Sequence, residues 1–70
     1  MADILTIKKR ISEVIAQSNY SQTALAEILG VSQQTISHYV KGDIAPSLET
    51  LSKLCKILDV DGNYILGLTD

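Results

Sequence analysis

The chain has 70 residues, of which 46% are hydrophobic, so it is long enough for one small domain and too apolar for a disordered segment. Six lysines and arginines stand against eight aspartates and glutamates, for a net charge of −2, and this composition by itself argues against a nucleic-acid partner. The single cysteine excludes an internal disulfide, and the sequence shows neither a signal peptide nor an apolar run of membrane-spanning length. We therefore expect one cytoplasmic domain over residues 1–70, with no membrane contact.

The first predicted helix begins near Asp3 and stops at residues 17–19. Its apolar residues recur at steps of three and four, which is the spacing of one helical stripe: Ile4, Ile7, Ile11, Val14 and Ile15. The basic residues 8–10 lie off this stripe, so we expect them to form the solvated face of the helix.

Three further helices are predicted to begin after a serine, because a serine side chain can accept a hydrogen bond from a free amide in the first turn. Ser21 precedes a helix over residues 22–29, which Gly30 can end in the left-handed conformation. Ser32 precedes a helix from residue 33 to about residue 41, ended by Gly42, and Ser47 precedes a helix over 48–58.

The carboxyl-terminal third continues this helical pattern. The helix over 48–58 carries an apolar stripe made of Leu48, Leu51, Leu54, Cys55 and Leu58, so we expect a buried, inert thiol. Residues 61–63 are predicted to break the chain, with Asp59 and Asp61 as capping residues, before a short helix over 64–66 that Gly67 ends. Because no strand pattern appears, the fold class is all-α.

Residues 22–40 predict two short helices joined by a tight turn at residues 30–32. Ala26 is small enough to let two steeply crossing helices approach closely, with Leu25, Leu29, Ile36 and Val40 as the apolar contact. The second helix of this pair keeps a polar face without a buried role, made of Gln33, Gln34, Ser37, His38 and Lys41.

The segment SQTALAEILGVSQQTISHYVKG resembles the helix-turn-helix of the lambda-type phage repressors and Cro proteins. The similarity includes Gln22, Ala26, Gly30 and Gly42, continues through the Pro46-Ser47 start of the next helix, and extends from about residue 7 to residue 67. It implies a compact five-helix bundle, a helix-turn-helix core at about residues 22–41, and a third helix that docks in the major groove of DNA.

The resemblance also implies which residues touch DNA. The base-reading residues are Gln33, Gln34, Ser37 and His38, and a glutamine amide can match both N6 and N7 of adenine. The backbone contacts are Ser21, Gln22, Thr35, Lys41 and the amides around Gly42, with Thr35 alternatively placing its methyl group near a thymine. His38 is also a candidate pH switch, although solvent exposure beside DNA is the plainer reading.

The implied partner is a pseudo-palindromic DNA operator, bound by a homodimer whose half-sites are about 34 Å apart. The family pattern places the dimer contact at Ile44, Tyr64, Ile65, Leu66 and Leu68, although Tyr64 and Leu68 are equally suited to closing the core. Such a protein would repress transcription by occupying a promoter. We expect no cofactor, no metal and no small-molecule ligand, since the domain has no room for a sizeable pocket.

Two departures from the family pattern bear on this hypothesis. Many relatives pair an arginine and a glutamate where this chain has Ile15 and Val40, so we predict that these two side chains touch. Asp43 lies in a loop where relatives often carry a base, and two cationic contacts per subunit would give a shallow log–log salt slope of about −3.6 for a dimer.

The acidic balance keeps a second hypothesis open: a protein-interaction module, antitoxin-like or anti-repressor, that retains the fold but binds DNA weakly or not at all. Catalysis is poorly supported, because the chain has no base–nucleophile pair and is too small to enclose a substrate. The sequence leaves open the operator, the regulated genes, and whether a further oligomerisation domain follows.

Overall fold

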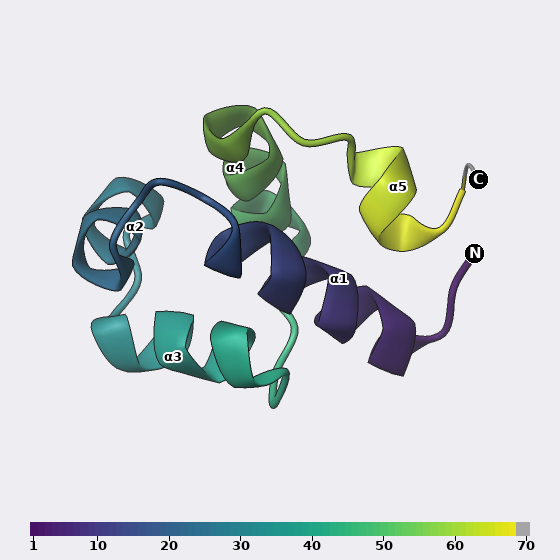
Figure 1. The fold of residues 1–70 in the computed structure, drawn as a ribbon, viewed down its shortest axis with the longest axis horizontal. Helices are drawn as coiled ribbons and strands as arrows, with labels where there is room; N and C mark the ends of the chain where they lie inside the picture. The colour runs from purple at the N-terminus through teal and green to yellow at the C-terminus, as the bar shows by residue number, and fades with distance from the viewer. Residues whose placement is uncertain (69–70) are drawn as a thin grey trace.

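Five α-helices make up the part of the chain that the computed structural model describes, residues 1–68, and no strand is found there. They are α1 (Ile4–Ala16), α2 (Gln22–Leu29), α3 (Gln33–Lys41), α4 (Leu48–Leu58) and α5 (Gly62–Leu66) (Figure 1). The predicted all-α class and the predicted bounds of the first four helices are confirmed.

The caps explain why the helix boundaries could be predicted. The side chains of Ser21, Ser32 and Ser47 each accept a hydrogen bond from the amide three residues later, at 3.0 to 3.2 Å. Asp3 does the same at the start of α1, where its carboxylate accepts from the Thr6 amide at 2.8 Å. Each bond satisfies an amide that has no partner within the helix.

The predicted break at residues 61–63 was wrong. The Asp61 carboxylate accepts from the Asn63 amide at 2.9 Å and caps α5, so this helix begins at Gly62, two residues before the expected start. Asp59 ends α4 in the left-handed conformation, with φ of 54°. Both aspartates are therefore capping residues, as predicted.

The core takes side chains from every helix. The buried residues are Ile7, Ile11, Ile15, Leu25, Ala26, Leu29, Ile36, Tyr39, Leu51, Leu54 and Ile65. Two predicted stripe members are exposed instead, Ile4 at 53% and Leu48 at 82%, because each is the first residue of its helix and extends past the packed layer. Tyr39, which was not among the predicted core residues, is only 4% exposed.

Helix α1 holds the other layers together, because it packs against both α3 and α5, while α2 packs against α3 and α4. Ile15 is buried and Val40 packs against the same apolar cluster from α3. Their direct contact remains a prediction. The Ser12 hydroxyl of α1 also donates a hydrogen bond to the Val40 carbonyl, which ties the carboxyl end of α3 to the scaffold.

The two ends of the described chain meet beside α5 (Figure 1). The Ala2 amide donates to the Leu66 carbonyl at 2.9 Å, and a Cβ atom added to Gly67 would lie 2.5 Å from the Ala2 nitrogen. The Arg10 guanidinium donates to the Tyr64 carbonyl and lies 4.8 Å from the centre of its ring. Arg10, expected on the solvated face, is therefore partly buried and fastens α1 to α5.

Candidate nucleic-acid interface

Helices α2 and α3 form a helix-turn-helix unit. Gly30 ends α2 with φ of 71°, the Val31 amide donates to the Ala26 carbonyl at 3.0 Å, and Ser32 then caps α3. Ala26 of α2 is 4% exposed and Ile36 of α3 is completely buried. Helices α2 and α3 pack against each other, and a buried residue as small as alanine suits the close approach that the sequence predicts for them.

One face of α3 is buried and the other faces solvent. Ile36 and Tyr39 point into the core, and Val40 packs against it, so the helix is held rigidly from one side. Gln33 and Gln34 are exposed at the amino end of α3. Ser37 and His38 are half-buried one turn later, and Lys41 is exposed at the carboxyl end. Figure 1 shows α3 along one side of the molecule.

The candidate backbone contacts lie at the helix ends. Gln22 is exposed as the first residue of α2, directly after the exposed Ser21, whose side-chain oxygen accepts from the Ala24 amide. The Thr35 hydroxyl lies 2.8 Å from the Ser32 hydroxyl, so it belongs to the cap of α3. Thr35 is half-buried there.

The expectation that the Gly42 amide holds a phosphate is wrong. With φ of 78° this residue ends α3, and its N–H donates to the Tyr39 carbonyl at 3.1 Å. The next amide, of Asp43, donates to the His38 carbonyl at 3.0 Å. Both amides therefore satisfy the last carbonyls of the helix and are not free donors.

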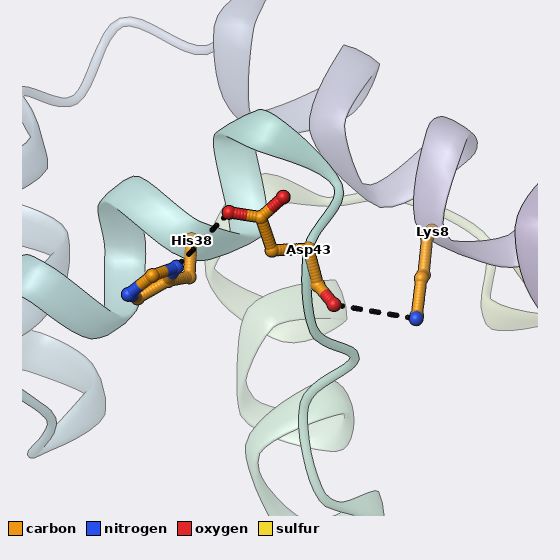
Figure 2. Close-up of polar contacts among 3 residues, drawn as sticks. All are labelled: Lys8, His38 and Asp43. Carbon is orange, nitrogen blue, oxygen red and sulfur yellow. Dashed lines mark hydrogen bonds and ion pairs between the residues drawn. The ribbon is translucent and has the colours of Figure 1, made fainter.

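The loop after α3 is fastened by Asp43 to two helices (Figure 2). Its carboxylate lies 3.1 Å from Nδ1 of His38, and its carbonyl accepts from the Lys8 ammonium of α1 at 3.3 Å. The His38 and Asp43 side chains are 40% and 53% exposed, so this polar pair is at the surface. His38 is thus not a freely solvated residue, because a specific partner orients its ring.

Half of the basic residues gather at the carboxyl end of α3. Lys8, Lys9 and Lys41 line one hollow of about 270 Å³ between α1 and α3, together with Leu5, Ser12, Glu13 and Gly42. Elsewhere in the described chain, the Arg10 side chain donates a hydrogen bond to the Tyr64 carbonyl of α5, and Lys53 forms an ion pair with Glu49 at 3.5 Å within α4. The sequence pattern did not indicate this cluster, because only the crossing of α1 over α3 brings residues 8 and 9 to residue 41.

The predicted dimer contact is only partly exposed. Ile44 (42%), Tyr64 (44%) and Leu68 (57%) present apolar surface. Ile65 is 0% exposed, so its assignment to a dimer contact was wrong: the side chain fills the core of the monomer. Leu66 is half-buried and packs against that core.

Sites of other kinds are not found among residues 1–68. This part of the chain holds no group of three or more His, Cys, Asp or Glu residues placed to bind a metal, and no helix of sufficient length and hydrophobicity to cross a membrane. Cys55 is half-buried rather than fully buried, and partial burial, together with the negative charge of Asp61, raises the pKa of its thiol. A thiol that stays protonated is a poor nucleophile.

A rigid helix with an exposed polar face, held by a second helix through a tight turn, defines a helix-turn-helix DNA-binding domain. The chain belongs to the helix-turn-helix family, whose family model matches residues 11–65. The match includes the whole of α2, α3 and α4.

The relatives are regulators by name. The chain is 42% identical over 64 residues to the HTH-type transcriptional regulator YgzD of Bacillus subtilis, with 91% of this chain and 97% of that protein covered. It is 34% identical to the SPbeta prophage-derived HTH-type transcriptional regulator YonR of the same organism, with 83% of this chain and 54% of YonR covered. For the regulator ImmR the identity is 30%, with 90% of this chain and 50% of ImmR covered.

Proposed function

We propose that the chain regulates transcription in the cytoplasm by binding a specific double-stranded DNA operator, and that it acts as a repressor of the phage repressor and Cro type. The observation that carries the proposal is the presentation of α3: buried Ile36 and Tyr39 fix its inner face, and its outer face is polar. A polar helix face held on a rigid scaffold suits the major groove, which admits one α-helix.

The exposed amides of Gln33 and Gln34 are the proposed base readers, because they lie at the amino end of α3, where helix-turn-helix proteins contact base edges. Ser37 and His38 extend the same face by one turn. A glutamine that pairs with adenine through two hydrogen bonds discriminates against other bases by about 1–3 kcal/mol.

The proposed phosphate contacts flank this reading face. At the start of α2 they are Ser21 and Gln22, with Thr35 as a weaker contact at the start of α3. Lys41 is the contact at the carboxyl end of α3, and Lys9 of α1, which lines the same hollow, extends it. Phosphate contacts of this kind set the register of a protein on the duplex without reading sequence.

We further propose that two copies bind a pseudo-palindromic operator, in line with the usual symmetry of such sites. The exposed Ile44, Tyr64 and Leu68, with the half-buried Leu66, are the proposed contact between the copies.

The net charge of −2 favours the second candidate function, a protein-interaction module that has lost DNA. The hollow between α1 and the carboxyl end of α3 weighs against it. Three lysines and one glutamate line this hollow, so its net charge is positive although the whole chain is acidic.

Selection from a randomised duplex library tests the proposal. We expect the wild-type chain to enrich a two-fold-symmetric site, and the Gln33→Ala/Gln34→Ala variant to lose preference at the bases that these residues read. Gln17→Ala, which removes an exposed glutamine at the end of α1, is the matched control and should enrich the wild-type site. No enrichment by the wild type at low salt would refute the proposal and favour the interaction module.

A further inference from the structure

His38 on α3 has a hydrogen-bond partner that fixes its ring. Nδ1 lies 3.1 Å from the Asp43 carboxylate, and Asp43 is itself held by two main-chain bonds. Its amide donates to the His38 carbonyl at 3.0 Å, and its carbonyl accepts from Lys8 at 3.3 Å. The partner of the ring is therefore anchored to both α3 and α1.

This pairing decides which ring nitrogen carries the hydrogen. A neutral imidazole has one N–H and one lone pair, whereas an ionised carboxylate can only accept. Nδ1 must therefore donate to Asp43, which leaves Nε2 as the acceptor. Figure 2 shows the second ring nitrogen of His38 pointing away from Asp43.

We infer that Asp43 is a positioning residue that makes His38 a hydrogen-bond acceptor toward the DNA bases. The inference rests on the proposed function, in which the outer face of α3 lies in the major groove. There an acceptor fits a base that presents an amino group, which is N6 of adenine or N4 of cytosine. It does not fit guanine, which offers only acceptors at this edge.

The tautomer can be measured without DNA. In the free wild-type domain with a neutral ring, nitrogen-15 NMR should show Nδ1 protonated and Nε2 unprotonated. In Asp43→Ala both tautomers should appear, because the acceptor is gone. A wild-type ring protonated at Nε2 would overturn the inference whatever the domain does with DNA.

The second test is duplex selection, with His38→Ala identifying the base pair that His38 reads. The wild type should prefer adenine or cytosine to guanine there by about fivefold, which is the value of one hydrogen bond. Asp43→Ala should lose this preference. If Asp43 were only a repulsive charge, its loss would strengthen binding to all sequences alike.

The outcomes separate the two proposals. A wild type that enriches a site, with the same preference opposite His38 in Asp43→Ala, overturns this inference and leaves the proposed function intact. A wild type that enriches no duplex refutes the proposed function, and the base preference falls with it.

Discussion

The salt dependence of DNA binding tests the assignment of phosphate contacts to the hollow between α1 and α3. Lys9 and Lys41 line this hollow and make no ion pair among the described residues, whereas Lys8 donates to the Asp43 carbonyl. If Lys9 and Lys41 each neutralise one phosphate, a dimer releases counterions at four positions. At about 0.9 per phosphate, the log–log slope of the binding constant against salt is about −3.6.

This slope has a measurable consequence. Raising monovalent salt fourfold, from about 50 to about 200 mM, should weaken binding by about 150-fold. In the double variant Lys9→Gln/Lys41→Gln the slope should fall close to zero, because the cationic contacts are gone. Affinity at low salt should fall as well, while the preference among bases should remain.

Fluorescence anisotropy of a labelled operator duplex, titrated at four or more salt concentrations, measures the slope. The matched control is Lys53→Gln/Lys56→Gln, which removes the same charge from α4, a helix that does not belong to the helix-turn-helix unit. The control should keep the wild-type slope. Equal slopes for the wild type and the Lys9/Lys41 variant would refute the assignment of phosphate contacts.

Three further predictions concern the scaffold. Gly30→Ala should lower the free energy of unfolding by about 1–2 kcal/mol, because alanine is strained in the left-handed conformation. Gly67→Ala should lower it further, because the new Cβ atom would also clash with the main chain of Ala2. Thermal denaturation of both variants measures the two losses, and equal losses would contradict the clash. The hydrogen bond from the Thr6 amide holds the pKa of Asp3 below its ordinary value of 3.8. Asp3→Ala should therefore reduce the free energy of unfolding by its full amount above about pH 4, and this difference from the wild type should disappear as the pH falls through the lowered pKa. Urea titrations at several pH values measure the difference, and a loss that does not change with pH would contradict the prediction. Burial raises the pKa of Cys55, so the folded chain should react with a thiol reagent more slowly at pH 7.5 than the urea-unfolded chain, and equal rates would contradict this assignment.

The helix bounds could be predicted from sequence because the hydrogen bonds that cap each helix join residues no more than four positions apart. Ser32 and Gly42 bracket α3 by bonds to residues in its first and last turns, and neither bond depends on the rest of the fold. The same rule mislocated the start of α5. Asp61 was correctly predicted as a capping residue, but Gly62 and Asn63 were assigned to a chain break, although a cap at Asp61 places both of them in the first turn of α5.

Tertiary packing decided what the sequence pattern left open. Ile65 was predicted at a dimer surface, but α5 turns this residue into the core. Arg10 was predicted to be solvated, yet the approach of α5 to α1 gives it a carbonyl partner and an aromatic ring. In the candidate site, the polar face of α3 followed from helical periodicity. The links from Asp43 to His38 and Lys8 did not, because they depend on the loop path and on a contact between residues 35 positions apart.

The most direct test of the central claim, that the outer face of α3 reads DNA, is NMR mapping of the interface. Amide shifts of the labelled domain would be followed while a selected operator duplex is added. We predict the largest changes at Gln33, Gln34 and His38, with a second group at Ser21 and Gln22 where α2 begins. Largest changes on α4, with the amides of α3 unmoved, would contradict the account.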